Sequence, residues 1–270
     1  MKGVVPFGQL APVTHARDGE LAWQRLVARC AADVTCRTHY PALDDDLRAI
    51  VSRLTTNAAT LPVKQADGTP STITLSAGLF GEIVRNMLYT PESAARLPSL
   101  VREVAKGELS ALAPLAVRTR NLLAGSDLSA GFFLSVTCTE GVPLVEPQTI
   151  SELTRGSFAG DYRLRQQIRA CEGWPRGDLF RGHLKPITSD AAVLMLSGEL
   201  DPVTPPSRGD ELLKFFQRGT HVVAANNGHP FGKLEGCGNV LIARFIEEGS
   251  MNGVDTSCAK AIPPVPFVVP

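Results

Sequence analysis

The stretch VLMLSGELDPVTPP, residues 193–206, decides the fold. Its apolar run leads to Asp201 and a proline-rich turn, and such a run is typical of a strand in a parallel sheet covered on both faces. Downstream, THVVAANNGH (220–229) is a second strand-like run, which stops at Gly228 and His229. Neighbouring parallel strands end at the same edge of a sheet, where α/β proteins place their ligands. The sequence therefore predicts that Asp201 and His229 lie together there, as two members of a catalytic triad.

The segments around these strands predict an α/β fold. Residues 206–219 (PSRGDELLKFFQRG) have the pattern of an amphipathic helix between the two strands. Residues 236–249 (GCGNVLIARFIEEG) predict a closing helix that stops at Gly249. GVVPFG (3–8) reads as a short buried strand near the start of the chain. This order of strands and helices is the signature of a doubly wound α/β sheet.

The long stretch between the first strand and the later ones predicts a mainly helical insertion. A hairpin is expected at 61–76 (LPVKQADGTPSTITLS), where alternating residues flank an Asp-Gly turn. In most of the remaining stretch the apolar residues have the spacing expected of successive helices. We expect a few-stranded parallel sheet with an inserted helical cap, in four segments: a first core strand and exit loop at 1–15, the cap at 16–188, the C-terminal core at 189–258 and an extended tail at 259–270.

The composition limits the classes of function. The chain has 270 residues, of which 44% are hydrophobic, so a sizeable core can form. Lys plus Arg and Asp plus Glu number 27 each, and this balance gives no reason to expect nucleic acid or an anionic membrane as a partner. No apolar run reaches the roughly 18 residues of a membrane-spanning helix. The opening MKGVVPFGQLAPV lacks the uninterrupted apolar region of a secretory signal, so no export signal is expected in this chain.

The six cysteines indicate an ancestry in an oxidising compartment. The chain has neither a CxxC motif nor a Cys/His cluster with zinc-finger spacing, so structural zinc is not expected. Sequential pairing is favoured because each pair closes a loop of modest length: Cys30–Cys36, Cys138–Cys171 and Cys237–Cys258. Six ordinary buried thiols are the alternative. Disulfides would suggest secreted or periplasmic ancestry, although the localisation itself stays unknown.

Several motifs resemble those of one enzyme family in their order along the chain. They are CAADVTCRTHYPAL, LYTPESAARLP, SVTCTEGVP and CEGWP, followed by AVLMLSGELDPVTPP, HVVAANNGHPFG and GCGNVLIARFIEEGS. Together they resemble the tripeptidyl-aminopeptidase and proline-iminopeptidase branch of the α/β-hydrolases, over essentially the whole chain. The resemblance implies that Asp201 is the triad acid, His229 the triad histidine and Glu140 an anchor for the free amino group of a substrate. It implies a peptide or other small-molecule substrate and requires no cofactor.

The chain departs from this family at the nucleophile. The family carries its serine on a G-x-S-x-G elbow, upstream of the strand that begins here at Gly3. No Gly-x-x-x-Gly segment of this chain has a central serine, and the oxyanion loop is missing too. Gly141 also stands where the family usually has an acidic residue after Glu140. The expectation is a truncated α/β-hydrolase that keeps the acid and the histidine.

Truncation would leave an unpaired edge on the strand at 3–8. Such an edge is a template for pairing with another chain, so a homodimer that covers the exposed sheet edge is expected. A partner polypeptide that supplies the missing half of the sheet is the alternative.

Three functions remain open. The first is a hydrolase derived from a serine aminopeptidase or esterase, inactive alone or active only with a complementing fragment. The second is a metal-dependent ester or phosphate ester hydrolase, in which Zn²⁺ or Mn²⁺ activates water. Its ligands would be the imidazoles and carboxylates expected near the strand ends: His15, Asp18, Glu199, Asp201 and His229. The third is a non-catalytic binding module, in which Asp201 only caps the turn before Pro202.

Overall fold

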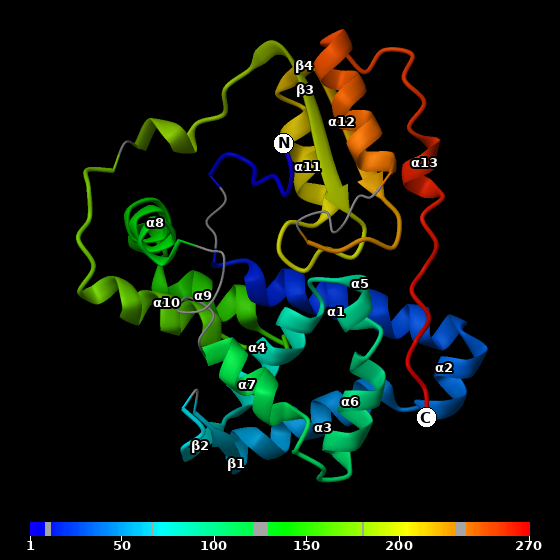
Figure 1. The fold of residues 1–270 in the computed structure, drawn as a ribbon. Coiled ribbons are helices and arrows are strands. Elements are labelled where there is room, and N and C mark those ends of the chain that lie inside the picture. The colour runs from blue at the N-terminus through cyan, green and yellow to red at the C-terminus, as the bar shows by residue number, and fades with distance from the viewer. Residues whose placement is uncertain (9–11, 66, 121–128, 180, 230–235) are drawn as a thin grey trace. The chain divides into compact units, whose positions relative to one another are not determined.

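The structure, a computed structural model, describes residues 1–8, 12–65, 67–120, 129–179, 181–229 and 236–270. The chain divides into two compact units. Unit 1 comprises Met1–Gln9, Leu88–Ala94 and Phe180–Pro266, and unit 2 comprises Leu10–Met87, Ala95–Leu179 and Phe267–Pro270. The chain thus passes between the units several times, as the colours of Figure 1 show. Residues 88–94, from the middle of the predicted cap segment, belong to the unit that contains the parallel strands.

Unit 1 is built on two parallel strands. Strand β3 (Ser189–Gly198) pairs with β4 (Phe216–Ala224), and Leu196 lies opposite Val222. Helix α11 (Pro206–Leu213) connects the strands, and α12 (Cys237–Glu248) follows β4. Helix α12 ends at Gly249, whose φ of 60° is the left-handed conformation expected of a glycine stop. The shorter elements of this unit are α5 (Pro91–Ala94), η3 (Arg181–Leu184) and α13 (Ser257–Lys260). The predicted strand–helix–strand–helix order is confirmed.

Both faces of the strand pair are covered, which explains why the strands are apolar throughout. The buried side chains of one face come from the two strands, from α12 and from the chain after it: Leu194, Leu196, Val222, Ala224, Leu241, Met251 and Ala259. Those of the other face come from β3, α11 and the N-terminal segment: Met195, Leu212 and Val4. Figure 1 shows α11 and α12 on opposite sides of β3 and β4. An α/β arrangement is therefore present in this unit.

The strand predicted at 3–8 is wrong. Strand-like pairing of the described N-terminal residues with β3 is limited to a parallel bridge between Lys2 and Leu196. The Leu196 N–H donates to the Met1 carbonyl oxygen at 2.9 Å, and the Gly3 N–H donates to the Leu196 carbonyl oxygen at 3.3 Å. Gly3 then adopts a φ of +61°, which turns the chain away from the strand direction. The apolar residues beyond it cover the sheet as side chains, with Val4 buried against Met195.

The second predicted strand is displaced along the sequence. Strand β4 begins at Phe216 and ends at Ala224, whereas the sequence pattern indicated 220–228. Helix α11 ends at Leu213, earlier than predicted, because Phe216 already packs against the core face of the sheet. His229 therefore follows a turn after the strand and not the strand itself.

Unit 2 is mainly helical, with one antiparallel hairpin. Strands β1 (Ala59–Lys64) and β2 (Pro70–Leu75) form the hairpin that the sequence predicted. The helices are α1 (His15–Ala32), α2 (Val34–His39), α3 (Leu43–Thr56), α4 (Ala77–Met87), α6 (Leu97–Ala105), α7 (Leu112–Arg120), α8 (Ala130–Val136), η1 (Thr137–Gly141), η2 (Val142–Leu144), α9 (Pro147–Thr154) and α10 (Tyr162–Glu172). His15 begins α1, so it does not lie in the exit loop that was expected to extend to residue 15.

Polar contacts inside unit 2 fix the helices. Arg85 donates to both carboxylate oxygens of Glu82, from Nε at 2.9 Å and from Nη2 at 2.6 Å, and both side chains are buried. The Trp23 indole N–H donates to Asp44 at 2.6 Å, which joins α1 to the first turn of α3. The buried ion pair lies entirely on α4, and removing one partner would leave a buried charge unpaired.

The tail predicted at 259–270 begins inside α13, residues 262–270 form neither helix nor strand, and the last four residues belong to unit 2. The Tyr40 hydroxyl donates to the Val268 carbonyl oxygen at 2.9 Å. The Val268 N–H donates to the Ala95 carbonyl oxygen at 3.1 Å. The Arg29 guanidinium lies 4.4 Å from the centre of the Phe267 ring, a cation–π contact.

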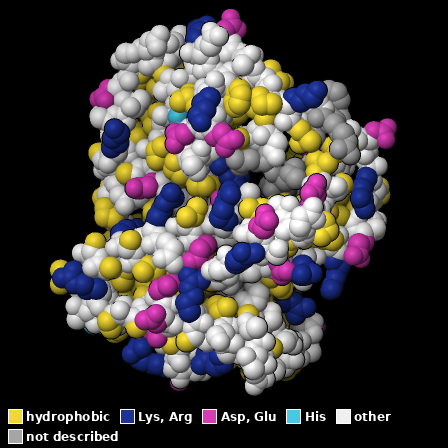
Figure 2. Space-filling view, turned by 180° about the vertical axis from the view of Figure 1, so that it is seen from behind, with side chains coloured by type: hydrophobic (Ala, Val, Ile, Leu, Met, Phe, Trp, Pro, Cys, Tyr) yellow, Lys and Arg dark blue, Asp and Glu magenta, His cyan; other side chains and the backbone are white. Residues whose placement is uncertain are grey.

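All three predicted cysteine pairs are confirmed as disulfides: Cys30–Cys36, Cys138–Cys171 and Cys237–Cys258. Among the described helices, none has both the length and the apolarity needed to cross a bilayer. Figure 2 shows one face of the molecule, on which Lys and Arg side chains are interspersed with Asp and Glu side chains. Charges of both signs are therefore mixed locally as well as balanced in number.

We expect the disulfides of unit 2 to differ in their contribution to stability. Replacing Cys138 and Cys171 together by serine opens a link between residues 33 apart, and should lower the free energy of unfolding by about 3–4 kcal/mol. The matched change at Cys30 and Cys36 opens a link of separation 6 and should cost about 2 kcal/mol. Urea unfolding measures both. If the change at Cys30 and Cys36 lowered the free energy of unfolding more than the change at Cys138 and Cys171, loop entropy would not explain how these disulfides stabilise the protein.

Candidate active site

Asp201 follows the turn at the end of β3 and is almost completely buried. One carboxylate oxygen, Oδ1, accepts the backbone N–H groups of Val203 at 2.7 Å and Thr204 at 2.8 Å. The other, Oδ2, accepts the Thr204 hydroxyl at 2.8 Å. A buried carboxylate is stable only when its oxygens are hydrogen-bonded, and the sequence DPVT supplies these donors locally.

His229 is held in place by its backbone and by an aromatic neighbour. The backbone N–H of His229 donates to the Tyr89 carbonyl oxygen at 2.7 Å. The Tyr89 ring meets the imidazole edge-on, with ring centres 5.2 Å apart. Asn226, with a φ of 54°, makes the turn after β4, and Gly228 passes so close to Tyr89 that a Cβ atom would overlap the Tyr89 carbonyl oxygen. Only glycine can precede the histidine in this arrangement.

The two predicted residues meet. His229 Nδ1 lies 2.8 Å from Asp201 Oδ2 and 3.2 Å from the Thr204 hydroxyl oxygen. Burial alone would raise the pKa of Asp201, but the hydrogen bond and positive charge of His229 and the backbone N–H groups of Thr204 and Val203 outweigh it. The pKa of Asp201 therefore lies below its ordinary value of 3.8. The carboxylate is ionised at neutral pH and fixes the orientation of the imidazole.

The opposite nitrogen of the His229 ring is Nε2. The side chain is 20% exposed, and no residue that the structure describes makes a hydrogen bond to Nε2. Gly3 lies beside the ring, since a Cβ atom there would be 3.3 Å from His229 Cε1 and 3.1 Å from the Thr204 hydroxyl oxygen. The N-terminal segment thus contributes the backbone of Gly3 to the wall of the site.

The other predicted site residues are divided between the two units. Glu199 is exposed, and its carboxylate accepts the Asn226 N–H at 2.8 Å, which stabilises the turn after β4. Glu140 is an exposed residue of η1 in unit 2. His15 and Asp18 are buried residues of α1, also in unit 2. The roles of Glu140 as an amine anchor and of the others as metal ligands remain predictions.

The arrangement around Asp201 does not fit a metal ligand. Its two oxygens already accept three hydrogen bonds and the contact with His229, so no lone pair is directed toward an ion. Within the described ranges no group of three or more His, Cys, Asp and Glu side chains is placed to hold a metal ion. No step that involves a metal is therefore derived.

Sequence reasoning missed two contributors to this site. Thr204 binds the carboxylate with both its N–H and its hydroxyl group, and an Asp followed three residues later by Thr is a recognisable signal for such a turn. Tyr89 supplies the carbonyl that holds His229, from a segment assigned to the helical insertion. Tyr89 has no comparable signal, because its role depends on its backbone.

A second hydrogen-bonded array was also missed. Ser197 Oγ lies 2.9 Å from His221 Nε2, and His221 Nδ1 lies 2.8 Å from Asp210 Oδ1. The connectivity is that of a Ser-His-Asp triad. However, Ser197 is buried on β3, and only Asp210 faces solvent, so the hydroxyl is closed to a substrate.

Comparison with known families gives one match, over the segment that contains both residues of the first array. Residues 156–258 match the Abhydrolase_4 family, described as TAP-like protein. This segment contains Asp201 and His229, and it confirms the resemblance to the tripeptidyl-aminopeptidase-like α/β-hydrolases. The chain is thus hydrolase-like in this region. No curated protein matches the chain.

We expect Asp201 to stabilise unit 1 in a pH-dependent manner. Because its folded-state pKa is below the ordinary 3.8, the contribution is present above that pH and disappears as the pH falls through the folded-state value. Asp201→Asn should lower the free energy of unfolding by about 2–3 kcal/mol at pH 7. The difference from wild type should shrink as the pH falls below 4, as measured by urea unfolding. If the difference in free energy of unfolding between wild type and Asp201→Asn stayed constant down to pH 2, the stabilisation would not come from the ionised Asp201 carboxylate.

Proposed function

We propose that Asp201 and His229 form the acid–base pair of a hydrolase of esters or amides. The observation that carries this proposal is the 2.8 Å contact between His229 Nδ1 and a buried carboxylate, together with an Nε2 atom that no described residue occupies. The carboxylate holds one tautomer, with the proton on Nδ1, and leaves the Nε2 lone pair to accept a proton. The TAP-like match of the same segment supports a hydrolase.

In this mechanism the imidazole transfers one proton in each direction. His229 Nε2 removes the proton of an attacking hydroxyl or water as the new bond to the carbonyl carbon forms. The ionised Asp201 stabilises the resulting imidazolium. The imidazolium then returns the proton to the departing alcohol or amine as the ester or amide bond breaks. The Tyr89 carbonyl and the Thr204 hydroxyl act indirectly, since they hold His229 and Asp201 in position.

The group that attacks the carbonyl is part of the proposal. No serine of this sequence occupies a G-x-S-x-G elbow, and the buried Ser197 is engaged with His221. We therefore propose that His229 activates a water molecule, or a hydroxyl supplied from outside these 270 residues. A metal-dependent reaction and a non-catalytic role remain alternatives that no specific contact favours.

Hydrolysis of p-nitrophenyl acetate tests the acid–base pair. We expect wild type to release p-nitrophenol faster than His229→Ala and Asp201→Asn, with kcat/KM lower by about 100-fold or more in both variants. His39→Ala, which changes an exposed histidine of α2, serves as the matched control and should retain wild-type activity. Circular dichroism shows whether each variant is folded.

The same assay separates the alternatives. Activity that is insensitive to His229→Ala would remove the pair from the mechanism, and loss of activity on chelation would favour the metal-dependent reading. Labelling with a fluorophosphonate would reveal an activated serine within the chain, which contradicts the proposed source of the nucleophile. If folded wild type hydrolysed neither esters nor amides, a non-catalytic binding module would be the favoured interpretation.

Self-association through the sheet is a further part of the proposal. Within the described residues β4 pairs with β3 alone, so its other edge has no strand partner. An unpaired edge favours a second copy of the chain. We expect light scattering to give about twice the 28.8 kDa mass of one chain at micromolar concentration. A single-chain mass throughout a dilution series would contradict the dimer and would leave the acid–base proposal unaffected.

A further inference from the structure

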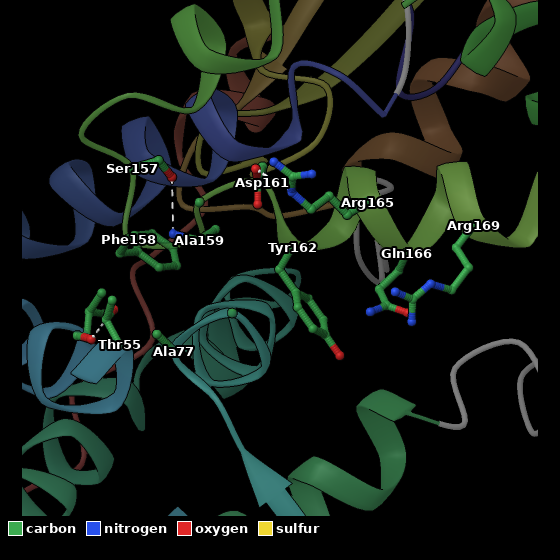
Figure 3. Close-up of a pocket in the computed structure, with 13 residues that line it drawn as sticks. Thr55, Ala77, Ser157, Phe158, Ala159, Asp161, Tyr162, Arg165, Gln166 and Arg169 are labelled. Atoms are coloured by element: carbon green, nitrogen blue, oxygen red, sulfur yellow. Dashed lines mark hydrogen bonds and ion pairs between the residues drawn. The ribbon is translucent and has the colours of Figure 1, made fainter. Parts of the chain in front are cut away.

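Unit 2 contains a cavity of about 440 Å³ that the proposed reaction does not use. Its walls come from segments that are distant in sequence: Val51 and Thr55 on α3, Ala77 and Gly78 at the start of α4, the loop 157–161, and Tyr162, Arg165, Gln166 and Arg169 on α10. Figure 3 shows these side chains around the cavity. A volume of this size is within the range of small-molecule sites in proteins.

The loop that forms one wall is firmly held. The Ser157 hydroxyl donates to the Ala16 carbonyl oxygen at 2.9 Å, and the Phe158 N–H donates to the Glu20 carboxylate at 3.0 Å. Phe158 is buried, and its ring meets Trp23 edge-on. The cavity is therefore formed before any ligand binds, which lowers the entropic cost of binding.

Glycines on α4 allow this helix to pack closely against the loop 157–161 and the start of α10. A Cβ atom at Gly78 would lie 2.6 Å from the Tyr162 ring, and one at Gly81 would lie 2.8 Å from the Phe158 carbonyl oxygen. The helix therefore packs directly on the loop and on the start of α10. The apolar lining consists of Val51, Ala77, Phe158, Ala159 and the Tyr162 ring.

The charge of the lining is positive. Asp161 accepts a hydrogen bond from Arg165 Nε at 2.7 Å, which leaves the terminal amino groups of Arg165 without a partner in the described chain. Arg169, one helical turn further along α10, makes no ion pair or hydrogen bond with any described residue. The lining thus contains two guanidinium groups and one carboxylate, an excess of one positive charge.

We propose that this cavity binds a small monoanionic carboxylate with an apolar body, such as an aryl or branched alkyl acid. The guanidinium of Arg169 matches a carboxylate in planar, bidentate geometry, and the terminal amino groups of Arg165 add positive charge to the same lining. The apolar body packs against Ala77 and the Tyr162 ring. A doubly charged phosphate is disfavoured, because Asp161 repels the second negative charge. This inference does not depend on the proposed hydrolase function.

Calorimetric titration of the full chain with 3-phenylpropanoate tests the proposal. We expect saturable binding, and a Kd about tenfold higher for the neutral isostere 3-phenylpropanamide, because the charge-assisted hydrogen bonds are lost. Phenyl phosphate should bind more weakly than the carboxylate. Arg169→Gln should raise the Kd for 3-phenylpropanoate about tenfold, whereas the matched change Arg96→Gln, at an exposed arginine of the same unit outside the cavity, should leave it unchanged.

A second variant tests the position of the site without changing its charge. Ala77→Leu places a larger side chain in the cavity and should also raise the Kd, while the thermal unfolding curve shows that unit 2 is folded. The proposal is overturned by the absence of saturable binding, by equal affinity for the amide, by tighter binding of the phosphate, or by equal weakening in Arg96→Gln. Binding that neither Arg169→Gln nor Ala77→Leu weakens would also place the ligand elsewhere.

Discussion

The hydrogen bond between Asp201 Oδ2 and His229 Nδ1 depends on the parallel pairing of β3 and β4. Parallel strands bring the ends of both segments to one edge of the sheet, so two residues far apart in sequence come within 2.8 Å. An antiparallel arrangement would place these ends at opposite edges. The helices on the two faces make this pairing possible, because they cover the apolar strands from both sides.

Close approach of backbone segments completes the geometry. A Cβ atom at Gly198 would overlap the Gly228 carbonyl oxygen, and one at Gly228 would overlap the Tyr89 carbonyl oxygen. Three segments therefore stack directly, with no side chain between them, beneath the acid and the histidine. The Leu200 N–H donates to the Asn227 carbonyl oxygen at 2.8 Å, which links the two turns. The position of the imidazole is thus determined by backbone contacts, and these tolerate no larger residue.

Sequence patterns predicted the elements with strong periodicity and missed those defined by tertiary contact. The apolar run of β3, the hairpin around Asp67 and Gly68, and the glycine stop of α12 depend on local chemistry and were predicted correctly. The start of β4 was misplaced because Phe216 belongs to the core despite its helical spacing. Residues 3–8 have strand-like composition, but Gly3 bends the chain after a single bridge. The Asp–His contact was predictable, whereas the support from Tyr89 was not, because a backbone carbonyl leaves no trace in side-chain patterns.

The array of Ser197, His221 and Asp210 shows why connectivity alone does not define an active site. Its hydrogen-bond distances are as short as those of the proposed pair, but here the acid is exposed and the histidine is buried. The Asp210 side chain is 67% exposed and the His221 side chain 3%. In the proposed pair the Asp201 side chain is 1% exposed and that of His229 20%. A carboxylate in water is screened and orients an imidazole weakly, whereas a buried one does so strongly. A base must also present a free nitrogen to the reacting group, and Ser197 already occupies that of His221. Burial of the acid, together with an Nε2 atom that makes no hydrogen bond to a described residue, therefore distinguishes the array of Asp201 and His229 from that of Asp210 and His221.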